Sequence, residues 1–421
     1  MARQPAPRDR RRRSAASGSA RGKPSTVGAL ASAMEAVAPA RLAEPWDNVG
    51  LLLGDRSAPC GRVLVAVDWT PAVMEEALAL RVDAVVAYHP PIFDAVKRIT
   101  ADRPHERSLL DAAQSGIALL SPHTALDAVQ GGVTDWLAEG VAGGAHRLAT
   151  ADLLEPLRPA TRLPDGERFK LVTFAPATAV PSIIDAWDAA GAGRIGAYDR
   201  CSTRHPVTGT FRGARGTAPA VGQAGRDEEV AEERIETVVG AERLPWAIAA
   251  LRAVHPYEEP AFEVHALAGR PSLDEGAGRL LELARPATLR ELGARLRRHL
   301  GAYRIDVVSV SGEGERHRRI ALCPGAGASF LPDAIARGAT LLVTGEARHH
   351  DHLAARAAGV SMLLPGHTWT ERGYMPMLAE RLARGLPGVE FTVSKSDAPP
   401  VTALGGRSAP APAARPRPPR R

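Results

Sequence analysis

The chain has little cysteine and no long apolar run. Only three of its 421 residues are cysteines, at positions 60, 201 and 323. Three cysteines at such wide spacing exclude a disulfide framework and a cysteine-based zinc site. This low cysteine content suits a reducing compartment. No stretch approaches the roughly 20 apolar residues of a membrane helix. The residues after Arg10–Arg13 are too polar for a secretory signal. We therefore expect a cytoplasmic protein with no membrane partner.

The overall composition is that of a globular protein. Apolar residues make up 45% of the chain and charged residues 24%, which excludes wholesale disorder and collagen-like repeats. At roughly 100–200 residues per domain, the length predicts two or three domains.

The positive charge is concentrated at the two ends. The formal net charge is +6, but residues 1–23 carry +7 and residues 406–421 carry +5, so residues 24–405 carry −6. Both ends are rich in Ala, Pro and Arg, and we expect disordered tails at 1–25 and 396–421. Nucleic acid would bind at most through these tails, because the body of the chain is acidic.

Between the tails the sequence divides into three blocks. Residues 26–163 and 275–395 alternate short apolar strands with helical stretches, which predicts an α/β domain made of two halves. Residues 168–267 follow the order strand–helix–strand–strand–helix–strand, which predicts a ferredoxin-like α+β insert. The flanking segments 157–167 and 268–278 are rich in Pro, Gly and polar residues, and we expect linkers there.

Four predicted strands end in residues that can bind metal ions. The strand at 84–87 precedes Tyr88 and His89, that at 117–120 precedes His123 and Asp127, that at 341–343 precedes Glu346 and His350, and that at 361–364 precedes His367 and Glu371. In an open α/β sheet, sites form beyond the carboxyl ends of the strands. Imidazoles mixed with carboxylates suit Zn, Mn, Fe or Co.

The alternative is that these polar residues only cap helices and satisfy loop backbone. For one isolated junction that is the better interpretation, since a lone histidine is usually structural. Four junctions from both halves of the chain favour a metal site instead. His367 and Glu371 are four residues apart, so on a helix they share one face.

Six stretches carry recognisable motifs, namely Glu44–Leu51, Tyr88–Phe93, Ser121–Asp127, Gly366–Arg372, Gly191–Tyr198 and His255–Pro260. The first four resemble the signatures of the Nif-three-like family, also named GTP cyclohydrolase I type-two homologs. The last two resemble the PII-like insert of its longer bacterial members. The resemblance runs from about residue 26 to residue 393. It implies a Nif-three-like α/β domain interrupted by a PII-like insert, a dinuclear metal centre and a homohexamer.

The resemblance also assigns roles to particular residues. The implied metal ligands are His89, Asp127, His367 and Glu371, with Glu371 bridging two divalent ions. His123, Glu346 and His350 match further positions around the pocket, and Glu371, His123 or His350 could transfer protons in catalysis.

Tyr88 departs from the family pattern. Many members have a histidine at this position, and a tyrosine, with an ordinary pKa near 10, is a poor ligand at neutral pH. We therefore expect one or two ions per chain. The first site (His89, Asp127, Glu371) should be held more tightly than the second, which keeps His367 and Glu371.

Two functions are compatible with these residues. One is a metal-dependent hydrolase with an unknown small-molecule substrate; the resemblance implies GTP ring opening, although no Walker-type phosphate loop is present. The other is a non-catalytic metal-binding protein with a regulatory or sensor role. Comparing turnover by the wild type and a Glu371→Gln variant would separate them.

Overall fold

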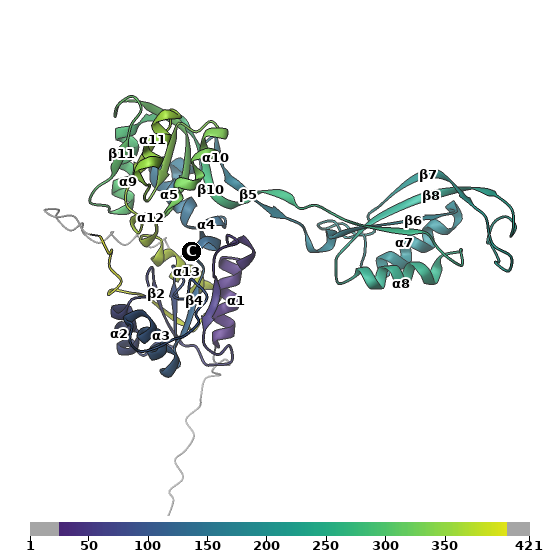
Figure 1. The fold of residues 1–421 in the computed structure, drawn as a ribbon, viewed down its shortest axis with the longest axis horizontal. Coiled ribbons are helices and arrows are strands. Elements are labelled where there is room, and N and C mark those ends of the chain that lie inside the picture. Colours follow the sequence, from purple (N-terminus) through teal and green to yellow (C-terminus); the bar gives the residue numbers. More distant parts are fainter. Residues whose placement is uncertain (1–24, 402–421) are drawn as a thin grey trace, which may run out of the picture. The chain divides into compact units, whose positions relative to one another are not determined.

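The computed structural model describes residues 25–401, and its contacts divide the chain into two compact units (Figure 1). One unit combines the two outer segments, up to Ala160 and from Leu273 onward, and the other is Thr161–Ser272. The basic segments 1–23 and 406–421, for which we expect disorder, lie outside the described residues. Within residues 25–401, no helix combines the length and apolar character needed to cross a membrane.

The outer unit contains a five-stranded sheet in the order β1-β4-β3-β2-β15. Its strands are β1 (Gly50–Leu53), β2 (Arg62–Ala66), β3 (Ala84–Ala87), β4 (Ala118–Ser121) and β15 (Glu390–Val393). β15, β2, β3 and β4 run parallel and β1 runs antiparallel to β4. Helices α2 (Pro71–Leu80) and α3 (Pro104–Gln114) pack on one face. Because β15 comes from the end of the chain, both halves of the sequence contribute to this sheet.

A second, six-stranded sheet has the order β11-β14-β13-β12-β10-β5. Its strands are β5 (Leu153–Arg162), β10 (Arg270–Thr288), β11 (Asp306–Val308), β12 (Arg316–Cys323), β13 (Leu341–Thr344) and β14 (Ser361–Leu364). β12, β13 and β14 are parallel, β10 pairs antiparallel with β12, and β11 pairs antiparallel with β14. Helices α10 (Leu331–Ala336) and α11 (His349–Ala357) share a core with one face of this sheet.

One hydrophobic core joins the remaining faces of the two sheets. It contains buried residues of both sheets and of helices α1 (Val27–Val37), α5 (Val133–Ala142), α9 (Leu289–Leu300) and α13 (Met375–Gly385). The shorter helices α4 (His123–Ala128), α6 (Ala145–Leu148) and α12 (Trp369–Arg372) complete the unit. These sheets and helices form a mixed α/β unit in which the carboxyl ends of strands from both halves of the sequence can meet.

The inner unit has a four-stranded sheet in the order β7-β8-β6-β9, with every neighbouring pair antiparallel. Its strands are β6 (Phe169–Ala175), β7 (Ser202–Phe211), β8 (Glu228–Val239) and β9 (Phe262–Ala266), and its helices are α7 (Val180–Ala189) and α8 (Leu244–Val254). The core of this unit contains Ile183, Trp187, Ile235 and Leu251. Its element order is the strand–helix–strand–strand–helix–strand order predicted from the sequence.

The two expected linkers contain the boundaries between the units, but most of their residues belong to strands β5 and β10 and not to irregular loops. Glycine and proline favoured a linker, yet Gly276 lies where a side chain could not fit. Its φ is +150°, and a Cβ atom there would lie 2.2 Å from the carbonyl oxygen of Arg158. This glycine therefore allows the backbones of β5 and β10 to approach closely.

Residues 396 and 397, which we expected to belong to the C-terminal tail, make contacts with the outer unit. The Asp397 carboxylate accepts a hydrogen bond from the Val67 amide (2.7 Å) and pairs with Arg372 (2.7 Å). The amides of Lys395 and Ser396 donate to Glu76. These contacts hold the chain beside the end of β2.

Candidate metal centre

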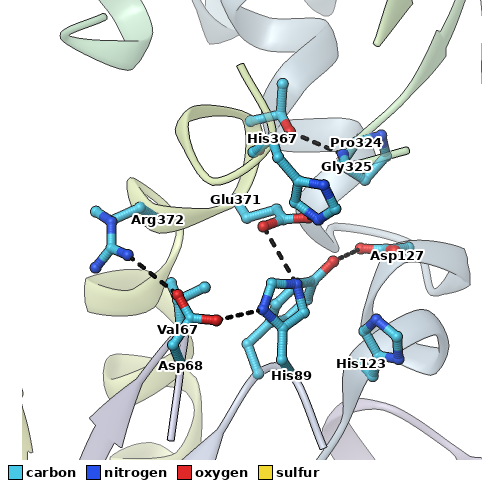
Figure 2. A network of polar contacts seen from close by, with 12 residues as sticks. Val67, Asp68, His89, His123, Asp127, Pro324, Gly325, His367, Glu371 and Arg372 are labelled. Atoms are coloured by element: carbon cyan, nitrogen blue, oxygen red, sulfur yellow. Dashed lines mark hydrogen bonds and ion pairs between the residues drawn. The ribbon is translucent and has the colours of Figure 1, made fainter. Parts of the chain in front are cut away.

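Two histidines and a glutamate come together beyond strands of the two sheets. His89 lies two residues past β3, whereas His367 and Glu371 follow β14, with Glu371 on α12. Each offers one ligand atom, and these atoms all lie within 4.8 Å of one another. Nε2 of His89 is 3.5 Å from Oε2 of Glu371, and Nε2 of His367 is 3.3 Å from Oε1. Figure 2 shows the two imidazoles on either side of this carboxylate.

Besides Glu371, which both rings face, a further carboxylate orients each of His89 and His367. Nδ1 of His89 donates to Asp68 (2.8 Å), and Nδ1 of His367 donates to Glu346 (2.9 Å). In the neutral ring, which is the form that binds a metal ion, a donating Nδ1 leaves the lone pair on Nε2, the atom that faces Glu371. This carboxylate–histidine arrangement is the usual support of a metal-binding imidazole.

The charges of the three residues reinforce one another. Burial lowers the pKa of His89, but the carboxylates of Asp68 and Glu371 outweigh it and raise the pKa to about 10. The hydrogen bond with Glu371 is the main reason that the pKa of His367 rises to about 9. Burial raises the pKa of Glu371, yet the two imidazoles outweigh that effect and lower it. Positive charge is thus stabilised at Nε2 of both histidines, where a bound cation would also be stabilised.

The residues around Glu371 fit a metal ion. Its side chain is 3% exposed, and Oε2 is buried without a hydrogen-bond partner in the described structure. A buried carboxylate oxygen that makes no hydrogen bond is costly unless a cation lies beside it. The protonated ring of His89, with Nε2 at 3.5 Å, supplies that charge in the metal-free protein, and a metal ion would supply it in the loaded one. The loop after β12 passes close by, since a Cβ on Gly325 would lie 2.7 Å from Oε1 of Glu371. Two imidazoles and a carboxylate suit a borderline divalent ion.

Asp127, expected as a ligand of the first site, is engaged differently. Its Oδ1 accepts a hydrogen bond from the Tyr88 hydroxyl at 2.6 Å. Burial raises the pKa of Asp127 well above its ordinary value, against the effect of this bond. The group of ligand atoms around His89 and Glu371 includes His367 and not Asp127.

A cavity of about 280 Å³ is lined by His367 and Glu371 and also by His123. Nδ1 of His123 donates to Asp47 (2.7 Å), and its ring centroid lies 5.4 Å from that of His89. The aromatic rings of Trp46 and Phe93 line the same cavity. His123 therefore lines the cavity beside the three candidate metal ligands.

His350, the third expected proton-transfer residue, lies elsewhere. It is exposed on α11, its ring is next to that of His349, and the described lining of the cavity does not include it. Glu346, from the same stretch, reaches the site through its hydrogen bond with His367.

Two carboxylates of the site were not assigned roles from the sequence. Asp68 directly follows the apolar run of β2, so the strand-end rule applied to His89 would also have found it. Asp47 lies within the Glu44–Leu51 motif, far from His123 in the sequence. Nothing in the spacing indicates their hydrogen bond.

Comparison with known proteins identifies the family. A family model described as Duf34/NIF3 (NGG1p interacting factor 3) matches residues 25–400. The chain belongs to the Duf34/NIF3 family. The match spans both units, including the insert.

Curated Duf34/NIF3 relatives resemble most of the chain. The GTP cyclohydrolase 1 type 2 homolog of Halalkalibacterium halodurans is 34% identical over 78% of this chain and 85% of its own length. The protein of the same name from Mycobacterium tuberculosis is 35% identical over 82% of this chain and 88% of its own length.

Solved structures support the same fold. A Bacillus cereus protein related to NIF3 has a TM-score of 0.63 and 29% identity, covering 91% of this chain and all of its own. A hypothetical protein of Staphylococcus aureus has a TM-score of 0.72 at 24% identity, over 91% of this chain and all of its own. The Duf34/NIF3 assignment therefore rests on sequence and fold together.

Proposed function

We propose that this Duf34/NIF3 protein binds a divalent metal ion through His89, His367 and Glu371 and hydrolyses a small molecule in the adjoining cavity. The observation that carries the proposal is the buried Glu371 carboxylate between two imidazoles that are each oriented by another carboxylate. Zn, Mn, Fe and Co all suit this donor set. The name of the curated relatives makes GTP a substrate to test first.

A divalent ion in such a site supplies hydroxide at neutral pH by lowering the pKa of bound water to about 7. The protein's own residues hold the ion and orient the side chains around it. Asp68 and Glu346 fix the imidazoles of His89 and His367. His123, oriented by Asp47, is placed to accept or return a proton in the cavity.

The experiment compares Glu371→Gln with wild type and with a control, Glu313→Gln. Glu313 is exposed in a pair with Arg290 and lies outside the residues of the site. Metal content is measured by mass spectrometry, and turnover is measured on nucleotides and small phosphoesters. We expect wild type and Glu313→Gln to retain metal and activity, and Glu371→Gln to lose both.

A second function is a non-catalytic metal sensor, in which the cavity binds an effector without turnover. If wild type retains metal but its rates equal those of Glu371→Gln on every substrate, this alternative replaces the hydrolase. If Glu371→Gln retained as much metal as the wild type, both functions would be contradicted.

We further propose a cytoplasmic homohexamer in which residues 168–267 form a PII-like module. The antiparallel strand order β7-β8-β6-β9 supports a ferredoxin-like arrangement of that module. Size-exclusion chromatography with light scattering tests the hexamer, which a monomer or dimer at micromolar concentration would contradict.

A further inference from the structure

Tyr88 and Asp127 form a hydrogen-bonded pair directly beside the metal ligands. The phenol donates to Oδ1 of Asp127 at 2.6 Å, and Tyr88 is 1% exposed. Its ring lies next to two imidazoles, with centroids 5.1 Å from His89 and 5.6 Å from His123. The Tyr88 ring therefore lies against both of these imidazoles.

The position of Tyr88 is set by the sheet. Its amide donates to the carbonyl of Ala66 (2.9 Å), and its carbonyl accepts a hydrogen bond from Oγ of Ser121 (2.7 Å). Strands β2 and β4 thus hold the backbone from both sides, and the buried ring has little room to turn. The direction of the hydroxyl toward Asp127 follows from this packing.

Because Tyr88 and Asp127 bond to each other, the phenol oxygen and one carboxylate oxygen are less available to bind a metal ion. The phenol presents its hydrogen to Asp127, and one oxygen of Asp127 is engaged in accepting it. Among the described residues, the ligand atoms that cluster belong to His89, His367 and Glu371 alone. Two imidazoles and one carboxylate are a complete protein set for one ion, with coordination positions left open.

We propose that Tyr88 makes this a one-ion site: it holds Asp127 as an outer carboxylate and leaves His89, His367 and Glu371 as the ligands of a single divalent cation. The inference rests on the proposed metal binding and goes beyond it, because it states how many ions the chain holds and which carboxylate is not a ligand. A histidine at position 88 would replace the phenol by an imidazole nitrogen beside Asp127 and His123. That change should add a second site.

The test is the metal content of full-length wild type, Tyr88→His and Tyr88→Phe after loading with Mn²⁺ or Zn²⁺ and gel filtration. We expect one ion per chain in wild type, two in Tyr88→His and one in Tyr88→Phe, which removes the hydroxyl without adding a ligand. Two ions in wild type, or one in a folded Tyr88→His, would overturn the inference. An absence of metal from wild type would instead overturn the proposed function itself.

Asp127→Asn supplies an independent readout if Tyr88→His fails to fold. As an outer residue, Asp127 should tolerate the change with a loss of metal affinity well below that of Glu371→Gln, measured by isothermal titration calorimetry. We expect about tenfold for Asp127→Asn and more than 100-fold for Glu371→Gln. Equal losses in the two variants would make Asp127 a ligand and overturn the inference.

Discussion

Asp68 accepts a hydrogen bond from Nδ1 of His89 at 2.8 Å, and the opposite ring nitrogen therefore faces Glu371. The same relation recurs between Glu346 and His367, from the other sheet of the unit. Figure 2 shows Asp68, His89 and Glu371 as one chain of polar contacts. The site is thus built from two carboxylate–histidine pairs that meet at one buried glutamate.

Removing the charge of Asp68 should weaken metal binding without unfolding the protein. Asp68→Asn keeps the size of the side chain but no longer stabilises a donating Nδ1 on His89. We expect metal affinity to fall about 10–100-fold, measured by isothermal titration calorimetry. Asp227→Asn, in an exposed pair with Arg212 on the inner unit, is the control and should bind like wild type. A loss in both variants would mean that the effect is not specific to the site.

Metal affinity should rise with pH. In the metal-free protein the pKa values of His89 and His367 are about 10 and about 9, so both rings are in the doubly protonated, cationic form at pH 7. A metal ion binds only the deprotonated rings, so binding releases about two protons and is favoured as pH rises. Between pH 6 and 8, log K should increase by about two per pH unit, and the rise should flatten above about pH 9–10. Titrations in buffers of different ionisation enthalpy count the protons, and a release of none would contradict the prediction.

Adding one methyl group at Gly325 should disturb the site. In Gly325→Ala the new Cβ would lie 2.7 Å from Oε1 of Glu371 and 3.1 Å from Nε2 of His367. Gly338 is the matched control, since its φ of +69° is close to the +60° of Gly325 and a Cβ there would meet nothing within 4 Å. Both alanine variants should lose roughly 1–2 kcal/mol of stability from the left-handed backbone. Gly325→Ala alone should lose metal, and equal metal contents would refute the close approach of this loop.

The buried Arg279 should be important for the stability of the outer unit. It is 2% exposed, and its guanidinium donates to Asp135 of α5 (2.5 Å) and to the carbonyl oxygens of Ala128 and Val129. Arg279→Met leaves Asp135 without its cationic partner, which should cost about 3–5 kcal/mol of unfolding free energy. Urea denaturation measures the loss. Arg290→Met, in an exposed pair, should change stability by less than about 1 kcal/mol.

Strands and their polar ends could be predicted because they follow local rules. Apolar runs such as 84–87 and 361–364 are strands in the structure, and the ligand-type residues beyond them include His89, His367 and Glu371. Ligand-type residues gather beyond the carboxyl ends of parallel strands. Because β3 and β14 belong to different sheets, the meeting of these three residues depends also on how the two sheets pack. The strand-end rule was sufficient to select the three residues proposed as metal ligands.

Pairwise contacts across the fold could not be predicted in the same way. Whether Asp127 faces an ion or the Tyr88 hydroxyl depends on how β3 and α4 pack. The spacing of these residues in the sequence does not predict that packing. The composition of residues 268–278 favours a linker, whereas in the structure Gly276 permits a close approach of β5, which only the paired strands reveal. The partnership of Asp68 with His89 likewise depends on the register of β2 against β3.

The most direct test of the account is X-ray diffraction from crystals of metal-loaded protein, with data collected at the absorption edge of the metal. We predict one anomalous peak per chain, within about 2.0–2.2 Å of Nε2 of His89, Nε2 of His367 and an oxygen of Glu371. An anomalous map without a peak at these three residues, from protein that contains the metal in solution, would contradict the account.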